Sequence, residues 1–470
     1  MEESRRRNPR ASVLGLKKLP GSVQLLDTRL KSYDPEVRRQ AYVNIFKLEA
    51  PEEPTVDKAV ELLDHENWYV REAGSKALAH CTDAGFAVCA ANVVQERLDD
   101  EDPDVRRRAA NALVELVERA NDPCRDKSGA AEAAEIAAAS LASRLEHTDA
   151  RVRQNALIAL SKMGAQATPH AVALCTLVVD PDLSIRNEVV RMVARLGAVI
   201  VQGVSALAQG LGHEDEPVRR SAKRALLALS KVCGAQVALA TSGMLKNENA
   251  VTRIATLDCL ADLGQLCGKH VQQMAELLEE MRQEVRLSAV RAIISVGSAA
   301  RPGLKEIRRR LTHENCDVRR AAVQTLRGLA SMCPSIPKVC AKDLEELEST
   351  RLQSLEILGG AAHLINGDKK YLYEIVHSLE DQDWLIRRAA IETLHDLQEH
   401  AAPIRMELGK RLVHSDAFVR RAAAEAVGRM GIHAGEIGHR LQGCLTGEED
   451  IDVRQTLEEA CQMLHAVGMA

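Results

Sequence analysis

Histidines recur in this chain at a fixed distance before an arginine, a pattern that could serve metal binding. Five histidines stand six residues ahead of an arginine, namely His65, His147, His213, His313 and His414. Imidazole is a common metal ligand, and three of the five are followed directly by glutamate, whose carboxylate is another. These pairs are His65-Glu66, His213-Glu214 and His313-Glu314. Metal binding would require the elements that carry these residues to bring them within a few ångströms of one another.

The arginines mark a repeat of about 33 residues. They are Arg38, Arg71, Arg106, Arg153, Arg186, Arg219, Arg253, Arg286, Arg319, Arg351, Arg387, Arg420 and Arg454. The residue before each arginine is Val, Ile or Thr, and the residue four before it is Asp or Asn in eleven of the thirteen repeats. Asp or Asn ahead of a periodic apolar run is typical of a helix N-cap, because its oxygen accepts a hydrogen bond from an otherwise unpartnered amide. Each arginine therefore lies near the start of a helix.

Each repeat contains two helices, A and then B, with the arginine in helix B. Positions −1, +3 and +7 relative to the arginine form one apolar stripe at helical spacing, and alanine is frequent at +3. A leucine eight residues before the arginine ends helix A in ten repeats, as Leu311 does. A glycine eleven residues after the arginine is expected to stop helix B. That glycine is present as Gly164, Gly197, Gly264, Gly297 and Gly431.

The segment from Leu145 to Leu160 carries the pattern Leu-x-His-x-Asp-x-x-Val-Arg-x-x-Ala-x-x-x-Leu. This pattern resembles the HEAT repeat, specifically its short phycobilisome-lyase-type form, and the resemblance covers about residues 21–470. It implies an all-α fold, a right-handed α-solenoid of about thirteen two-helix repeats in the armadillo/HEAT superfamily. The resemblance is specific for the fold alone, because this family contains scaffolds, adaptors and a few enzymes.

Composition agrees with one continuous solenoid. Ten aromatic residues in 470 fit thin two-helix layers better than a core built around large rings. Residues 1–20 are expected to form a basic, disordered tail, and residues 21–470 a single solenoid. The 47-residue gap between Arg106 and Arg153 predicts an insertion loop near residues 121–134. Such a loop could bind a partner or be a tolerated solvent loop.

The repeat geometry argues against a metal site. The five histidines never fall in neighbouring repeats, and layers about 9 to 10 Å apart would separate them by about 18 Å or more. Zinc ligands lie about 2 Å from the ion. The histidines are therefore predicted to form hydrogen bonds in the turn before helix B, within a column of polar residues at position −6. No metal and no cofactor are expected.

Two enzyme classes with HEAT-like repeats are weighed against these residues. Deoxyhypusine hydroxylase binds two irons with His-Glu pairs just after the repeat arginine, whereas the pairs here precede it, and the positions after it read, for example, Asn187-Glu188. Bilin lyases or isomerases share the repeat subtype, but no residue here is assigned to hold a tetrapyrrole. The chain is predicted not to be an enzyme, with a bilin-lyase-like activity kept as an alternative.

The repeat arginines resemble structural rungs that bond carbonyl or acidic groups in their own or the adjacent turn. A different column, five residues after the arginine on the exposed side of helix B, is the candidate binding surface. It carries Arg191, Arg224 and Arg291 in the middle repeats, and Glu356, Glu392, Glu425 and Glu459 in the last four. The resemblance implies that helix B lines the concave face. A groove with two signs of charge suits a protein partner with complementary patches.

Local pairing is the alternative explanation for these charges. Arg388 with Glu392 and Arg421 with Glu425 stand four residues apart and could pair on one helix. The like-charge pairs cannot be explained in this way, and they make the central arginines the leading candidates. These pairs are Arg191 with Arg195 and Arg220 with Arg224.

The only two tryptophans, Trp68 and Trp384, both stand three residues before a repeat arginine. Each is predicted either to anchor a partner or to pack over the neighbouring turn. Nucleic-acid binding through the central basic stripe remains an alternative, although a net charge of −5 and the lack of aromatic residues nearby disfavour it.

The remaining features concern the compartment. No 18-residue apolar run and no signal-peptide core are recognised, so no membrane insertion is expected. The twelve cysteines show no Cys-x-x-Cys spacing and are predicted to be reduced core residues of an intracellular, cytoplasmic protein. Targeting to an organelle by the tail is the alternative. The sequence thus predicts a protein-interaction scaffold or adaptor, or a structural subunit of a larger assembly, that binds an extended protein along helix B.

Overall fold

The computed structural model describes residues 62–66, 68–79, 84–120, 130–346, 350–360 and 369–468, together with Arg29, Ser32, Asp34, Val37 and Val60. The predicted tail, residues 1–20, lies outside this part of the chain. The chain divides into unit 1, residues 1–240, and unit 2, residues 241–470, which are described separately. The described ranges contain α-helices and 3-10 helices and no strand. The all-α prediction is confirmed.

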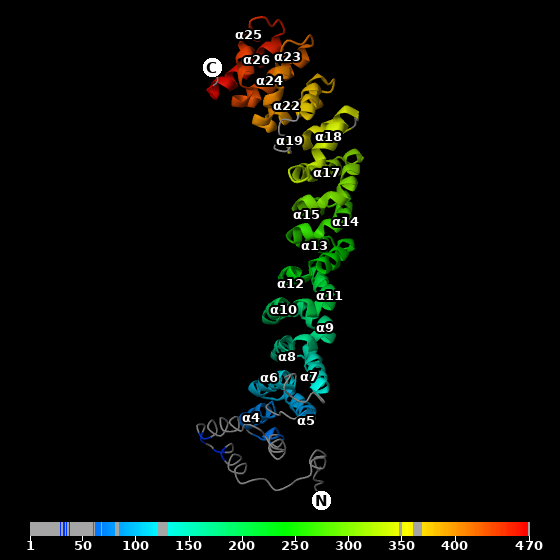
Figure 1. The fold of residues 1–470 in the computed structure, drawn as a ribbon, viewed down its shortest axis with the longest axis vertical. Helices are drawn as coiled ribbons and strands as arrows, with labels where there is room; N and C mark the ends of the chain where they lie inside the picture. Colours follow the sequence, from blue (N-terminus) through cyan, green and yellow to red (C-terminus); the bar gives the residue numbers. More distant parts are fainter. Residues whose placement is uncertain are drawn as a thin grey trace, which may run out of the picture. The chain divides into compact units, whose positions relative to one another are not determined.

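Unit 1 is a stack of two-helix layers. Its B helices are α4 (Trp68–Leu78), α6 (Pro103–Ala120), α8 (Ala150–Lys162), α10 (Leu183–Leu196) and the first part of α12 (Glu216–Gly243). Its A helices are α5 (Ala84–Val94), α7 (Ala130–Ser143), α9 (Ala171–Thr176) and α11 (Val204–Gln209). Figure 1 shows the B helices in one row and the A helices in a second row. Each described B helix from α4 to α10 contacts the next one along the chain, which is the packing of a solenoid.

Unit 2 repeats the same arrangement. Its B helices are α13 (Ala250–Leu263), α15 (Gln283–Val296), α17 (Cys316–Ala330), α19 (Arg351–Gly359), α22 (Trp384–Leu397), α24 (Ala417–Met430) and α26 (Ile451–Ala466). Its A helices are α14 (Val271–Glu276), α16 (Leu304–Arg309), α18 (Ser335–Glu346), α21 (Lys369–His377), α23 (Arg405–Arg411) and α25 (Glu436–Leu445). Again each B helix packs on the next. The α-solenoid prediction is confirmed within each unit, and the right-handed superhelical path stays a prediction.

The predicted apolar stripe forms the core between layers. At position −1, for example, Val105, Ile185 and Val285 are at most 1% exposed. The predicted N-caps are also present, since Asp149 and Asp182 accept hydrogen bonds from the amides two residues later. Local residue choice thus sets where each B helix begins and which face it buries.

Helix A differs from the simple prediction. In several repeats it is interrupted, with a seven-residue 3-10 segment ahead of a short α-helix, as in η4 (Gly164–His170), η6 (Gly197–Gly203), η9 (Gly264–His270), η11 (Gly297–Gly303) and η15 (Gln398–Ile404). The predicted insertion also needs correction. Residues 130–134 belong to helix α7, and α6 continues to Ala120 past the position where other B helices stop. Residues 121–129 lie outside the described residues.

The stop signal at position +11 is a backbone conformation that favours glycine. Gly164, Gly197, Gly264, Gly297 and Gly431 have φ between 52° and 62°. Gln398 occupies the same position with φ 47° and ψ −122°. A side chain in this region of the φ/ψ map costs about 1 to 3 kcal/mol, and glycine avoids that cost.

We therefore expect Gln398→Gly to raise the free energy of unfolding by about 1 kcal/mol, the strain relief exceeding the entropy that glycine adds to the unfolded chain. Thermal denaturation followed by circular dichroism measures the change. Gly264→Gln is the matched reverse substitution and should lower stability, since its φ is 55°. A loss of stability in the Gln398→Gly variant would contradict the assignment of strain.

Two stretches correct the expectation that no long apolar run exists. Residues 183–212 contain an 18-residue window with a mean hydropathy of 1.5, and residues 216–246 contain one with a mean hydropathy of 1.4. In each window 44% is buried. Their mean hydropathy is high because the A segment of each stretch contains almost no charged residue and follows the apolar stripe of a B helix. Both are interrupted, the first at Gly197 and the second at Cys233, where φ is −132° and ψ is 54°. Helix α10 alone, at about 1.5 Å per residue, is roughly 21 Å long, short of the 30 Å hydrocarbon core.

Candidate protein-interaction surface

The repeat arginines are structural rungs, as predicted. Arg153 shows the arrangement: its Nη1 donates to the carbonyl oxygens of His147 and Thr148 at 2.7 and 2.9 Å. Its Nε and Nη2 donate to the two carboxylate oxygens of Asp180 in the next repeat, at 2.7 and 3.0 Å. Arg153 thus closes its own turn and links it to the following layer.

The carbonyl contacts recur through the described repeats, whereas the acidic contact depends on the residue that the next repeat supplies. Carboxylates at position −6 of the next repeat bind the arginine in five cases, the pairs Arg71–Asp100, Arg153–Asp180, Arg253–Glu280, Arg351–Asp381 and Arg420–Glu448. Where that position is histidine, Arg106 instead pairs with Asp149 at 3.2 Å, and Arg286 with Asp317 at 3.0 Å. The rungs therefore do not form a free basic array.

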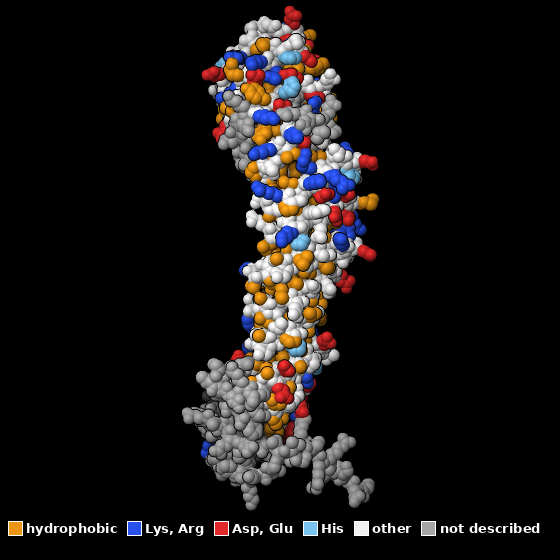
Figure 2. Space-filling model, turned by 45° about the vertical axis from the view of Figure 1, so that its right-hand side comes forward, with side chains coloured by type: hydrophobic (Ala, Val, Ile, Leu, Met, Phe, Trp, Pro, Cys, Tyr) orange, Lys and Arg blue, Asp and Glu red, His pale blue; other side chains and the backbone are white. Residues whose placement is uncertain are grey.

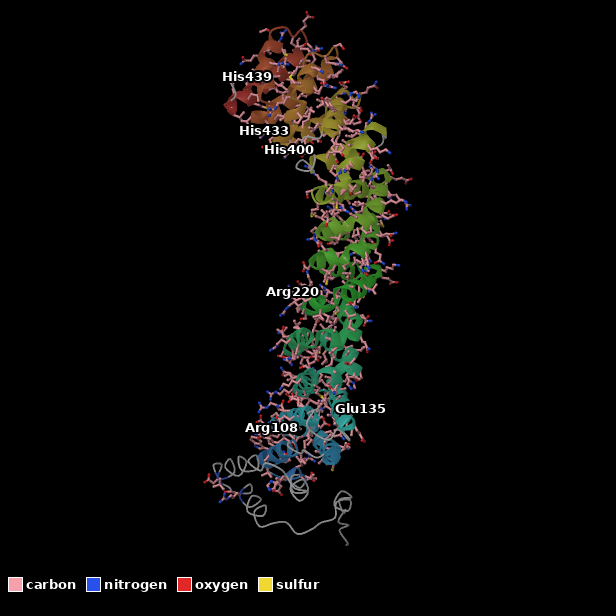
Figure 3. The ribbon with its side chains drawn as sticks, viewed as in Figure 1. Arg108, Glu135, Arg220, His400, His433 and His439 are labelled. Atoms are coloured by element: carbon pink, nitrogen blue, oxygen red, sulfur yellow. The ribbon has the colours of Figure 1, made fainter. Side chains whose placement is uncertain are left out.

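The histidines at position −6 are hydrogen-bond acceptors in the turn, which confirms that prediction for four of the five. Nδ1 of His147, His213, His313 and His414 accepts from the backbone amide two residues later, at 3.0 to 3.1 Å. Asp100, Asp180 and Asp381 accept the equivalent bond through carboxylate oxygens. Within the described ranges no three His, Cys, Asp or Glu residues form a group that could hold a metal ion. His400, His433 and His439, at the C-terminal end of unit 2 (Figure 3), form no such group either.

One rung gives a pH prediction. Arg420 donates to both oxygens of Glu448 at 2.7 and 2.8 Å, and this bonding lowers the pKa of the Glu448 carboxyl. A carboxyl whose pKa is lower in the folded state stabilises the fold above its unfolded pKa, about 4.3, and loses that contribution as the pH falls through the folded pKa. The stability advantage of the wild type over Glu448→Gln should be constant near neutral pH and shrink below about pH 4.5. Urea denaturation at a series of pH values measures it, and a constant difference down to pH 3 would contradict the prediction.

The candidate arginines of unit 1 lie on the B side. Arg191 and Arg195 are on α10 and Arg220 and Arg224 on α12, and all four are exposed. Figure 3 shows Arg220 and Arg108 on the side of the B helices, and Glu135 of α7 on the opposite side. The structure therefore brings the predicted central residues onto one face of unit 1.

These four arginines all have local partners, which corrects the inference that like charges stand there uncompensated. Arg191 Nε lies 3.2 Å from Glu188, and Arg220 pairs with Glu216 one turn earlier. Arg195 donates to the Ser161 hydroxyl at 2.6 Å, and Arg224 to the Asn187 side chain at 3.2 Å. Two of the four partners are neutral, so the cluster keeps an excess of two positive charges over these acids (four Arg minus two Glu).

The candidates of unit 2 are also partnered. Arg291 lies 3.4 Å from Asp258. Glu392 pairs with Arg388 at 3.2 Å, as the local-pairing alternative predicted. Glu425 pairs with Arg429 at 2.8 Å rather than with Arg421; both arginines lie four residues away, and a glutamate that precedes the cation on a helix is the favoured orientation. Glu459 accepts from Gln455 at 3.0 Å and is exposed.

The two tryptophans differ. Trp384 is 58% exposed at the start of α22, beside Leu385, whereas Trp68 is half-buried. The sequence reasoning missed Phe418 at the start of α24, which is 63% exposed and has the Arg387 guanidinium 5.4 Å from its ring centre. The sequence feature that could have identified Phe418 is its position two residues before a repeat arginine. Trp384 and Phe418 thus expose aromatic surface at the starts of two consecutive B helices.

The described cysteines are free thiols, and six are buried. Burial raises the pKa of Cys175, Cys267 and Cys340 to about 12. These thiols are therefore protonated at neutral pH and pack as small apolar groups.

Comparisons with known proteins agree with this architecture. Family models of HEAT repeats match residues 138–228 and 376–462, and a HEAT repeat model matches residues 91–120. No curated protein matches the chain. The phycobilisome-lyase-type subtype stays a prediction.

Among solved structures, the karyopherin Kap121p bound to the extreme C-terminus of the protein phosphatase Cdc14p is 13% identical, with a TM-score of 0.40 over 95% of this chain and 54% of that chain. A homology model of the full-length AP-3 complex is 11% identical, with a TM-score of 0.41 over 95% of this chain and 87% of that chain. Yeast importin-beta, Kap95p, is 13% identical, with a TM-score of 0.33 over 95% and 67%. The chain spans about half the length of the Kap121p chains it matches. The family models thus identify HEAT repeats in residues 91–120, 138–228 and 376–462, and the same two-helix layers recur in the described residues between these segments.

Proposed function

We propose that the protein is a non-enzymatic scaffold or adaptor that binds an extended protein along its B helices. The observation that carries the proposal is the arginine cluster of unit 1. The side chains of Arg191 and Arg220 are 65% and 71% exposed, and Arg195 and Arg224 have only neutral partners. Exposed cations held by short local contacts can exchange those contacts for the carboxylates of a partner at little cost.

The B side of unit 2 offers the complementary character. Glu392, Glu425 and Glu459 occupy one column, and Trp384 and Phe418 supply exposed aromatic surface. Tryptophan and arginine are frequent anchors in protein interfaces. We propose that acidic segments of the partner bind unit 1 and that basic segments bind unit 2. The free cysteines support an intracellular, cytoplasmic location, and membership of a larger assembly fits the same surfaces.

Charge reversal tests this proposal. Partners are first isolated with the wild-type protein and identified by mass spectrometry, and the affinity of each purified partner is then measured. The double variant Arg191→Glu, Arg224→Glu should bind its partner roughly 10- to 100-fold more weakly, because two attractions become repulsions. Its melting temperature should change little, since exposed ion pairs contribute about 0 to 1 kcal/mol each.

Lys269→Glu is the matched control, because Lys269 is an exposed cation in η9, an A segment, and not on a B helix. It should leave affinity unchanged. If the double variant binds every isolated partner with wild-type affinity, the arginine cluster is not the binding surface.

A further inference from the structure

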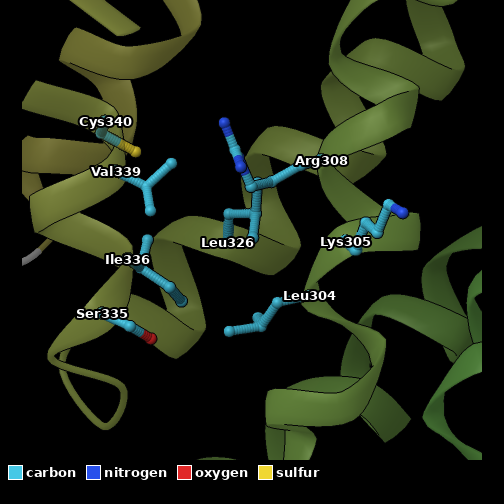
Figure 4. Close-up of a pocket in the computed structure, with 8 residues that line it drawn as sticks. All are labelled: Leu304, Lys305, Arg308, Leu326, Ser335, Ile336, Val339 and Cys340. Carbon is cyan, nitrogen blue, oxygen red and sulfur yellow. The ribbon is translucent and has the colours of Figure 1, made fainter. Parts of the chain in front are cut away.

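A small apolar pocket lies on the A side of unit 2, away from the surface proposed above. It has a volume of about 130 Å³ and lies between α16 and α18, with Leu326 of α17 in its lining (Figure 4). Leu326, Ile336 and Cys340 line it and are 1 to 4% exposed, while Leu304 and Val339 are half-buried. An apolar protein cavity of about 150 Å³ accepts a benzene molecule. This pocket therefore matches one aliphatic or aromatic side chain in size.

The pocket exists because the repeat departs from its usual course here. After α15, the chain turns at Gly297 and a seven-residue 3-10 segment, Gly297–Gly303, precedes the A helix. After α17, position +11 is Ala330, and the chain passes through Met332 and Pro334 directly into α18, a single α-helix. Helix α16 packs against α14, but it makes few backbone contacts with α18. The missing 3-10 segment leaves the space between α16 and α18 open.

The rim of the pocket is positively charged. Lys305 lines it from α16, and Lys338 is exposed on α18 one residue before Val339, which lines the pocket; neither lysine has a hydrogen-bond or ion-pair partner within the described part of the chain. Arg308 donates from Nη2 to both oxygens of Asp343 at 2.9 and 3.1 Å, while its Nε is buried without a hydrogen-bond partner. Figure 2 shows Lys and Arg side chains on the A side of unit 2, interspersed with Asp and Glu side chains. The apolar pocket thus has the unpaired Lys305 in its lining, and the unpaired Lys338 lies next to it in the sequence of α18.

We propose that this pocket seats one leucine or phenylalanine side chain of an extended acidic segment of a partner protein. The apolar side chain would displace water from Leu326, Ile336 and Val339, and flanking carboxylates would meet Lys305 and Lys338. Unpaired cations beside an apolar pocket favour a partner that supplies both apolar surface and negative charge. The site is independent of the arginine cluster on the B side, so each can fail without the other.

A defined peptide tests the proposal on the full-length protein. The probe is a fluorescein-labelled peptide with three acidic residues on each side of one phenylalanine, measured by fluorescence anisotropy. Replacing that phenylalanine with alanine should weaken binding roughly 10- to 100-fold, the amount expected for burying one large apolar side chain. Val339 is half-buried at the rim, and the Val339→Phe substitution fills the pocket. This variant should bind the phenylalanine peptide only as weakly as the wild type binds the alanine peptide.

Matched variants distinguish the effects of filling the pocket and of reversing the lysine charges from a general loss of folding. Val413→Phe changes a valine of unit 2 that is 74% exposed, and it should leave binding unchanged. The double variant Lys305→Glu, Lys338→Glu should bind both peptides more weakly, and its binding should depend less on salt. The double variant Arg191→Glu, Arg224→Glu should not change the difference in affinity between the two peptides. Circular dichroism confirms that each variant is folded.

Three results of the peptide experiment would overturn the proposal, and sedimentation can supply a fourth. They are equal affinity of the phenylalanine and alanine peptides, no binding of the phenylalanine peptide at 1 mM (roughly −4 kcal/mol of binding free energy), or undiminished binding to folded Val339→Phe. Sedimentation of the wild type and of Val339→Phe is run in parallel. If the wild type self-associates and the variant does not, the occupant is a second copy of the chain, and the acidic-partner proposal is wrong.

Discussion

Replacing Arg153 with alanine is expected to lower the free energy of unfolding by about 3 to 5 kcal/mol. The Arg153 and Asp180 side chains are only 12% and 3% exposed, so the substitution leaves a buried carboxylate without its partner. It also removes the donors to the carbonyl groups of His147 and Thr148. Chemical denaturation monitored by circular dichroism measures the loss.

Arg151 provides the control for this experiment. It is exposed in the first turn of the same helix, and its side chain makes no hydrogen bond or ion pair within the described residues. Arg151→Ala should change stability by less than about 0.5 kcal/mol. Arg153→Lys keeps the charge but cannot bond both carboxylate oxygens and both carbonyls, so it should recover only part of the loss. Equal effects of Arg151→Ala and Arg153→Ala would refute the structural role of the rung.

The second large effect is expected at Gly203, where two consecutive A helices approach closely. A Cβ atom at this position would lie 2.4 Å from the Ala171 carbonyl oxygen and 2.5 Å from the Cys175 Sγ. The carbonyl belongs to the backbone of α9 and cannot move without shifting that helix. Gly203→Ala should therefore lower the free energy of unfolding by about 1 to 3 kcal/mol, measured by thermal denaturation.

Gly243 is the matched glycine at the end of α12. A Cβ atom there would meet nothing within 4 Å. Gly243→Ala should stabilise the protein by about 0.4 to 1 kcal/mol, because alanine reduces the entropy of the unfolded chain. If both variants are stabilised, the close approach at Gly203 is not a real constraint.

The candidate surface could be predicted only in part. The column at position +5 correctly placed Arg191 and Arg224 on the exposed B side, because helical periodicity fixes which residues share a face. Their partners were not predictable, since Asn187 lies 37 residues from Arg224 and Ser161 lies 34 residues from Arg195. Such pairs depend on the offset between neighbouring layers, which the sequence pattern does not contain. The pocket beside Lys305 was missed for the same reason.

The sequence by itself determined the local features of this protein. An aspartate at position −4 starts helix B, an apolar residue at −1 faces the core, and the residue at +11 ends the helix, because each depends on hydrogen bonds and side-chain periodicity within a few residues. Tertiary structure alone decided the rest. It selected Ser161 for Arg195 and Asn187 for Arg224, placed Gly203 against α9, and opened the pocket between α16 and α18. These outcomes depend on the distance between packed helices, and a change of one or two ångströms in that distance forms or breaks each contact.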